Sequence, residues 1–260
     1  MGLYTEAFKK AQDDGRFDSS FHGNNVFAEN LNTALPVKRS QYTVASTLSV
    51  GNYQAIGRLH EKIEYLLPTG ASRVIAFCGC SGNEGTSAVA HNLSAYYAQH
   101  ANHKSVSIPN SGKSVPHNIL LIDCNLHSPQ QHTYFNQKAQ HGLAEIIETN
   151  APLSRSTSWI VPMQYGFISA GRPKSSISGI FKSDKVQNLL KKAKEAFTTI
   201  ILDFAAITIH PDIIPLLSRI DGVMLVCKEK HTKQESVLRA QKIIEQRNGK
   251  LLGLIINTNQ

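Results

Sequence analysis

The stretch VIAFCGCSGNEGTSAVA, from Val74 to Ala90, decides how this chain folds. An apolar run leads into a glycine-containing turn, and small residues suited to the start of a helix follow it. This order of strand, loop and helix is typical of a P-loop, in which backbone N–H groups surround the phosphates of a nucleotide. The residues predicted to form this loop and to bind the cofactor are Gly82, Asn83, Glu84, Gly85, Thr86 and Ser87.

The loop lacks the lysine that normally belongs to it. The pattern G-x-x-x-x-G-K-[ST] ends here in Gly85-Thr86-Ser87, and Cys80 occupies the position of the first glycine. A charged hydrogen bond to phosphate contributes about 1.5–3 kcal/mol, so this loss weakens nucleotide binding by about 10- to 100-fold. The remaining backbone N–H groups and the N-terminus of the following helix still attract an anion. The sequence therefore predicts weak binding of ATP or ADP with Mg²⁺, and inefficient phosphoryl transfer.

The rest of the chain alternates apolar runs with helical patterns. The runs carry apolar residues continuously, as strands buried on both faces do; they span 74–78, 119–123, 199–204, 222–227 and 251–256. The patterns predict helices over 86–99, 185–197, 213–218 and 232–246. Strands that alternate with helices imply a parallel sheet covered on both sides. The predicted fold class is α/β: a P-loop NTPase-type, doubly wound, mainly parallel sheet with helices on both faces.

The pattern divides the chain into an arm and one domain. Residues 1–50 have little apolar periodicity and many polar residues, which predicts a flexible N-terminal arm with a short helix over Leu3–Ala11. A P-loop NTPase-like domain is predicted over 51–260. It opens with a helix that carries Tyr53 and Leu66 and ends before Pro68. The segment 101–118 is polar and is predicted to be a surface insertion.

Composition narrows the setting in which the chain works. No apolar run approaches the roughly 18 residues that a membrane span needs, so direct membrane insertion is not expected. Four cysteines without framework spacing favour a reducing, cytoplasmic setting. The formal net charge is +8, with lysines gathered at 182–194 and 228–233. These lysines indicate either solvated helix faces or a docking surface for acidic protein, lipid headgroups or nucleic acid. No basic run is interleaved with aromatics, so sequence-specific nucleic-acid recognition is not expected.

Two strands of the predicted sheet end in a carboxylate. ILLID ends at Asp123, and TIILDF carries Asp203 near its end. Carboxylates at the carboxyl ends of parallel strands, beside a phosphate loop, are well placed for Mg²⁺ or its waters. Asp123 and Asp203 are therefore the candidate catalytic residues, and with Ser87 they form the predicted magnesium ligand set. The alternative is that both aspartates only cap strand ends and that Ser87 is a first-turn polar residue of the helix.

These elements, in this order, resemble the cytoplasmic domain of the bacterial tyrosine kinases (BY-kinases). BY-kinases are P-loop proteins that partner membrane polysaccharide co-polymerases in capsule and exopolysaccharide export. The resemblance covers about residues 50–260. The family's PGEGKS is matched by 82–87, its D-x-D-x-R by 123–127 and its IIDTPP by 201–206, and further landmarks by 142–147, 168–173, 221–226 and 252–257. The resemblance places Asn257 near the base of the nucleotide.

The departures from the family pattern concern its charges. Thr86 replaces the lysine, Asn125 the second aspartate and His127 the arginine. The helical E-x-x-R-x-x-R used for ring assembly aligns with Gln54, Gly57 and His60. The resemblance thus implies a degenerate, pseudokinase-like member that acts as a regulatory or scaffolding partner in exopolysaccharide biosynthesis. Its expected partners are a membrane polysaccharide co-polymerase or a sister kinase, which would hold it at the cytoplasmic side of the inner membrane; monomer, homo-oligomer and mixed assembly stay open.

Two other functions stay open at this point. The chain is either degenerate or a working tyrosine autokinase or ATPase that borrows a cation from a loop, for example Lys104 or Lys174, or from a neighbouring subunit. The third possibility is a partitioning-type ATPase that uses the positive charge to position DNA or protein cargo. Cys80 and Cys124 flank the same predicted site, and whether they touch is left open.

Overall fold

The computed structural model describes residues 38–41, 50–67, 72–100, 105–107, 114–116, 119–135, 141–161, 165–173 and 176–258. The helix expected over Leu3–Ala11 lies outside these residues, as do Lys104 and Lys174.

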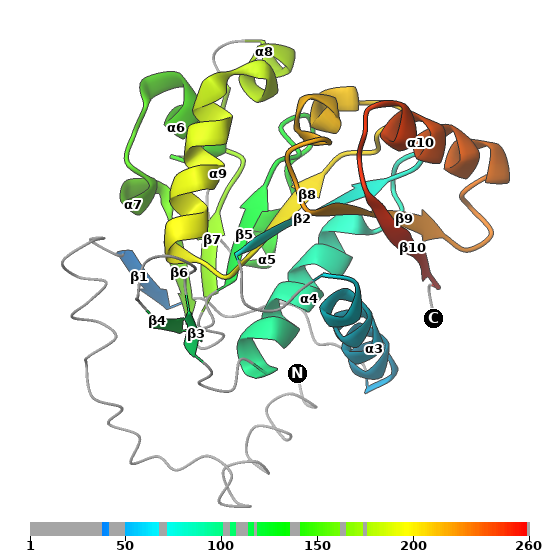
Figure 1. The fold of residues 1–260 in the computed structure, drawn as a ribbon, viewed down its shortest axis with the longest axis horizontal. Helices are drawn as coiled ribbons and strands as arrows, with labels where there is room; N and C mark the ends of the chain where they lie inside the picture. The colour runs from blue at the N-terminus through cyan, green and yellow to red at the C-terminus, as the bar shows by residue number, and fades with distance from the viewer. Residues whose placement is uncertain are drawn as a thin grey trace, which may run out of the picture.

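The described residues form a doubly wound α/β fold around an eight-stranded sheet (Figure 1). Neighbouring strands are parallel, except for the antiparallel pair β6–β7. In spatial order, the strands are β1 (Lys38–Gln41), β6 (Ser158–Val161), β7 (Tyr165–Ile168), β5 (Ile119–Asp123), β8 (Thr199–Phe204), β2 (Arg73–Gly79), β9 (Gly222–Lys228) and β10 (Leu251–Asn257). The predicted fold class is confirmed, because the sheet is mostly parallel and helices alternate with its strands along the chain.

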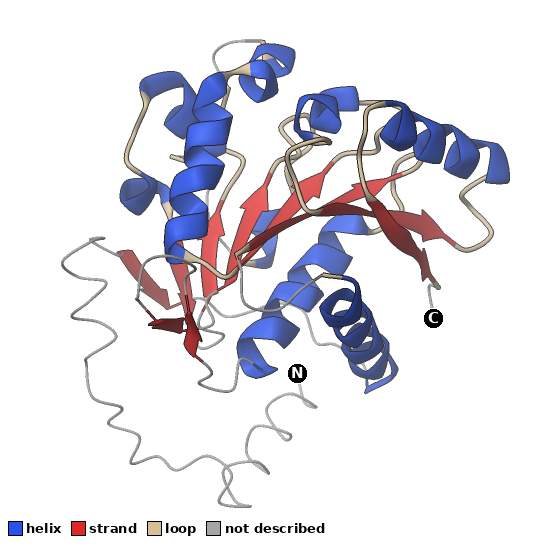
Figure 2. Ribbon diagram, viewed as in Figure 1, coloured by secondary structure: helices blue, strands red, loops and turns tan. Residues whose placement is uncertain are grey.

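Helices cover both faces of the sheet (Figure 2). One face carries α3 (Val50–Leu66) and α4 (Thr86–His100), together with the short α5 (Gln131–Tyr134). The other face carries α6 (Leu143–Thr149), α7 (Leu153–Ser156), α8 (Ile177–Lys182), α9 (Asp184–Ala196), the 3₁₀ helix η1 (Pro211–Leu216) and α10 (Gln234–Gln246). Helix α9 begins where its sequence predicts, because the Ser183 hydroxyl accepts a hydrogen bond from the Lys185 N–H.

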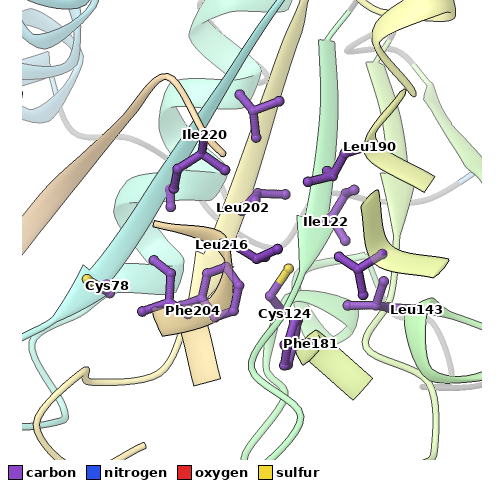
Figure 3. Close-up of a cluster of buried hydrophobic side chains, with 14 of the residues drawn as sticks. Cys78, Ile122, Cys124, Leu143, Phe181, Leu190, Leu202, Phe204, Leu216 and Ile220 are labelled. Atoms are coloured by element: carbon purple, nitrogen blue, oxygen red, sulfur yellow. The ribbon is translucent and has the colours of Figure 1, made fainter. Parts of the chain in front are cut away.

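The sheet separates two apolar layers, because successive side chains of a strand point to opposite faces. On one side, Ile75 and Phe77 of β2 pack with α3 and α4. On the other side, Val74 and Cys78 belong to a larger cluster with α6, α8, α9, η1 and α10 (Figure 3). Every residue of β2 is buried, which explains why its sequence is apolar without alternation.

The structure adds short elements that the sequence pattern did not predict. Strands β6 and β7 form an antiparallel pair beside β5, and β1, within the predicted arm, pairs with β6. The insertion at 101–118 contains an antiparallel pair, β3 (Ser105–Ser107) and β4 (Ser114–Pro116). The helix expected over 213–218 is the 3₁₀ helix η1, which carries Pro215 inside it. The division between arm and domain at residue 50 stays a prediction.

Candidate functional site

The phosphate loop joins β2 to α4 and has the backbone that its glycines allow. Gly82, Asn83 and Gly85 have φ values of 98°, 60° and 80°. Glycine tolerates this left-handed region without a Cβ penalty. A Cβ at Gly85 would also lie 2.4 Å from the side-chain nitrogen of Asn257. Gly85 is therefore needed for its conformation and for the close approach of β10.

Glu84 holds the loop from within. Its carboxylate is 1% exposed and accepts hydrogen bonds from the backbone N–H of Ser81 and of Gly82, the latter at 2.7 Å. The Ser81 hydroxyl donates at 2.7 Å and the Thr232 hydroxyl at 3.3 Å. A buried carboxylate without a cation needs several such donors. The side chain that the sequence assigned to cofactor binding is thus used inside the loop.

Residues from the last two strands close the other side of the loop. The Asn257 side chain donates to the Glu84 carbonyl at 2.9 Å. His231, in the turn after β9, has its Nε2 at 3.2 Å from the Gly82 carbonyl oxygen. Asn257 was predicted from the family resemblance to lie near this site, and the structure brings it against the loop. His231 and Thr232 were not predicted; the only signal for them was the family landmark at 221–226, which ends just before them.

Asp123 and Asp203 meet at the carboxyl ends of their strands. They are register partners on β5 and β8, and both are fully buried. Asp123 accepts hydrogen bonds from the backbone N–H of Asn125 and of Gln131, each at 3.1 Å. Asp203 accepts one from the Gln131 side chain at 2.8 Å, and the same amide nitrogen donates to the Ser87 carbonyl at 2.8 Å. Gln131 therefore ties together the three predicted magnesium ligands.

The environment of these carboxyls favours their protonated forms. Burial raises the pKa of Asp203 to about 6, against hydrogen bonds from Ser87 and Gln131 that favour the charged form. Burial raises the pKa of Asp123 well above its usual value, and the neighbouring Asp203 adds to this. No lysine or arginine of the described residues is among the groups that shift either pKa. Without a lysine or arginine of the described residues to balance them, the two buried carboxyls favour the neutral form.

The residues offer oxygen ligands to Mg²⁺ only if Gln131 moves. The buried Oδ1 of Asp203 and Oε1 of Gln131 have no hydrogen-bond partner among the described residues. Mg²⁺ keeps several waters in an octahedral shell. Asp123, Asp203 and Gln131 are all 0% exposed, so this arrangement leaves no access for those waters. The donors fit Mg²⁺ in kind, but Gln131 occupies the approach to them.

Asn125 and the cysteines near the site make contacts with neighbouring residues of the chain. The Asn125 side chain accepts from the Ser128 N–H at 3.1 Å and donates to the Ser128 carbonyl at 2.9 Å, so it closes a turn. Cys80 makes its sulfur contact with Cys227, at 3.5 Å, and burial raises the pKa of the Cys80 thiol well above its usual value. All four cysteines are free and buried, as expected of small core residues.

The sequence of this chain is similar to the sequences of several bacterial proteins. No protein-family model matches the chain. It is 26% identical over 208 residues to the tyrosine-protein kinase ptk of Acinetobacter johnsonii, covering 80% of this chain and 26% of that protein. It is 26% identical over 184 residues to the tyrosine-protein kinase YwqD of Bacillus subtilis, covering 71% of each. The chain is a relative of the bacterial tyrosine kinases. It is also 25% identical over 200 residues to the succinoglycan biosynthesis transport protein ExoP of Rhizobium meliloti, covering 75% of this chain and 23% of that protein.

Solved structures of a bacterial tyrosine kinase domain and of a ParA family ATPase have the same fold. The kinase domain of the Escherichia coli tyrosine kinase ETK matches with a TM-score of 0.73 at 19% identity, over 88% of this chain and 86% of that one. A ParA family ATPase from Chlorobium tepidum matches with a TM-score of 0.53 at 19% identity, over 74% of each chain. Both likenesses show the fold alone. The BY-kinase-like chain spans about a quarter of the Acinetobacter and Rhizobium proteins, at 26% and 23% of their lengths.

None of the described helices combines the length and apolar character needed to cross a bilayer.

Proposed function

We propose that this BY-kinase-like chain is a degenerate member of its family and works as a regulatory or scaffolding partner in exopolysaccharide or capsule biosynthesis and export. It docks onto a membrane polysaccharide co-polymerase or a sister kinase, which keeps it at the cytoplasmic side of the inner membrane. Support comes from relatives named as tyrosine kinases and as an exopolysaccharide transport protein. Residual nucleotide binding to Gly82–Ser87 shapes the docking surface.

One observation carries the proposal: the loop has no lysine at the usual position, and no lysine or arginine of the described residues shifts the pKa of Asp123 or Asp203. Thr86 stands at the lysine position, and Gln131 binds Asp203 and the loop carbonyl of Ser87. Transfer of a γ-phosphoryl group depends on positioned cations that neutralise developing charge. Catalysis therefore loses more than binding does, because the backbone N–H groups of the loop still attract the phosphates.

The first experiment measures what the wild-type protein does with ATP and Mg²⁺. We expect weak ATP binding by titration calorimetry and no measurable tyrosine phosphorylation or ATP hydrolysis. Restoring the cation with Thr86→Lys should tighten ATP binding by about 10- to 100-fold. Thr86→Met, which has similar length but no charge, is the matched control and should give no gain. Robust turnover by the wild-type protein would end the proposal.

The second experiment tests the partner. The cytoplasmic segments of a two-span co-polymerase from the same genome, or of a sister kinase, should co-purify with the chain without added ATP. Thr86→Met should bind equally well, because docking does not need catalysis. Failure of both partners to bind, or binding only in the presence of hydrolysable ATP, would contradict a scaffolding role.

A second candidate function is a working ATPase or autokinase that receives its cation from another subunit. The observation that favours it is the buried, unpaired Oδ1 of Asp203, an oxygen free to bind a cation. In that case Thr86→Lys changes ATP affinity little. The hydrolysis rate per molecule then rises with protein concentration, or on addition of a sister kinase.

A further inference from the structure

We propose that His127, His210 and Asp212 form a binding site for a divalent transition-metal ion of the Zn²⁺ class. One donor atom from each residue lies within 4.8 Å of the other two. The site is separate from the acidic pair at Asp123 and Asp203, and it does not depend on the proposed function.

Two segments bring these residues together. His127 lies in the turn that follows β5, and His210 precedes η1, whose first turn carries Asp212. The stretch before His210 is fixed to the phosphate loop: the Ile207 N–H donates to the Gly79 carbonyl at 3.0 Å, and the Thr208 hydroxyl donates to the Cys80 carbonyl at 2.5 Å. The His210 N–H donates to the Ala206 carbonyl at 2.8 Å. The backbone that presents the donors is therefore held in place.

The three side chains already contact one another. His127 Nε2 lies 2.6 Å from Asp212 Oδ2, and the rings of His127 and His210 stack with centroids 3.7 Å apart. The side chains of His127 and Asp212 are 29% and 11% exposed, so an ion can reach them from solvent. The carboxylate oxygen and one imidazole nitrogen therefore already face each other, as two ligands of one ion would.

Metal binding requires only side-chain movement. Zn²⁺ bonds of about 2.0–2.2 Å in a tetrahedral shell place neighbouring donors about 3.3 Å apart. Two face-to-face rings cannot both point a nitrogen at one ion, so one imidazole must rotate about its side-chain bonds. The ion then takes the place of the hydrogen bond between His127 and Asp212, and the neutral imidazole carries its proton on the ring nitrogen that faces away from the ion.

The donor types select the class of metal. Two imidazoles and one carboxylate suit Zn²⁺, Co²⁺, Ni²⁺ or Cu²⁺, and they leave at least one coordination position open to water or to an oxyanion. Mg²⁺ prefers an all-oxygen shell and does not compete here. The donor set at His127 therefore differs from the all-oxygen set at Asp123 and Asp203, which Gln131 covers.

The experiment titrates Zn²⁺ into the full chain by calorimetry and Co²⁺ by visible absorption. We expect one ion per chain and a tetrahedral or five-coordinate Co²⁺ spectrum, unaffected by millimolar Mg²⁺. His127→Ala, His210→Ala and Asp212→Asn should each weaken Zn²⁺ binding at least tenfold. His141→Asn is the matched control: this exposed histidine has a φ of 55°, which asparagine tolerates, and its loss should leave the affinity unchanged.

Folding is checked by circular dichroism, and His127→Asn serves as a milder second variant should His127→Ala unfold. The proposal is overturned if folded His127 and His210 variants bind Zn²⁺ as tightly as the wild-type protein. It is equally overturned if Co²⁺ shows only the octahedral spectrum of the hydrated ion, or if His141→Asn causes the larger loss.

Discussion

The two ends of the central strands bury charge in opposite ways. At the amino end of β2, Arg73 is 5% exposed and pairs with the carboxylate of Glu64, although its Nη1 has no hydrogen-bond partner among the described residues. Its guanidinium bonds to Glu64 of α3, to the Tyr97 hydroxyl at 3.1 Å and to the Thr199 hydroxyl at 3.1 Å. At the carboxyl end of the neighbouring strand β8, Asp203 lies buried beside Asp123 with no cation among the described residues.

This contrast separates electrostatics that stabilise the fold from electrostatics suited to binding. Burial opposes the charge of Glu64, but the hydrogen bond and charge of Arg73 overcome it and lower the pKa of Glu64. Burial instead raises the pKa of both aspartates, and the neighbouring Asp203 raises the pKa of Asp123 further. A buried like-charged pair costs stability, and such strain is common where a site is kept for a cation. The predictions below test the two ends separately.

The largest expected effect is at the amino end of β2, where Arg73 pairs with Glu64. Arg73→Met leaves Glu64 partly buried without its cation and should lower the free energy of unfolding by about 3–5 kcal/mol. Chemical denaturation measures this. The double variant Arg73→Met/Glu64→Gln should lose less than the sum of the single variants, because the two side chains act as a pair. If the losses of unfolding free energy of the two single variants add fully, Arg73 and Glu64 are not coupled. The amino end of β2 would then not be stabilised by this charge pair.

At the unbalanced end, the aspartates should give the opposite pH dependence to that of a paired carboxylate. The folded-state pKa of Asp203, about 6, exceeds its unfolded value. The folded state therefore holds a proton that the unfolded state has released, and stability falls as pH rises from about 4 to about 6. Asp203→Asn should remove roughly 1–3 kcal/mol of this fall. The measurement is the difference between the unfolding free energies of the wild-type protein and the variant across that pH range. This difference would not change with pH if a cation balanced the Asp203 carboxylate.

Gln131 is expected to have an intermediate effect, because it covers the acidic pair. Gln131→Ala removes its bonds to Asp203 and Ser87, which should cost about 1–3 kcal/mol of stability. It also opens the approach to the carboxylates, so Mg²⁺ should raise the melting temperature of this variant more than that of the wild-type protein. Gln130→Ala, at the exposed neighbouring position, is the control. Equal stabilisation of all three proteins by Mg²⁺ would show that Gln131 does not obstruct the site.

The smallest expected effect concerns the clamp on the phosphate loop. The Thr232 hydroxyl donates to Glu84 and accepts from the Lys228 N–H at 2.9 Å. Thr232→Val should cost about 0.5–1.5 kcal/mol and leave the fold unchanged. Native-state hydrogen exchange of the Ser81 and Gly82 amides should become faster, because Glu84 loses one of the groups that hold it. Unchanged exchange would mean that the loop holds Glu84 without Thr232.

Much of the fold was predictable because it rests on local patterns. The buried strands β2, β5 and β8 are continuous apolar runs, and the loop glycines mark the turn into α4. Strands β6 and β7 were missed because each has only four residues and they gain their stability from pairing with each other and with β5. A run that short does not distinguish a strand from a buried turn.

The candidate site was predictable in its backbone and less so in its side chains. The sequence predicted correctly that Asp123 and Asp203 lie close together, because parallel strands end at the same edge of a sheet. It did not indicate that Glu84 turns into the loop, or that Gln131 enters between the aspartates from a four-residue helix. Those positions depend on which polar groups are left unpaired once the core has packed.

The sequence by itself determined the strand order along the chain, the place of the phosphate loop and the loss of its lysine at Thr86. These are properties of residue type and spacing, and the chain carries them before it folds. Only the tertiary structure decided which polar side chains meet: Arg73 pairs with Glu64 of α3, Gln131 covers the acidic pair, and His127 meets Asp212 from a segment 85 residues away. The reason is physical: hydrogen bonds and ion pairs act over a few ångströms, so their partners are chosen by packing and not by position along the chain.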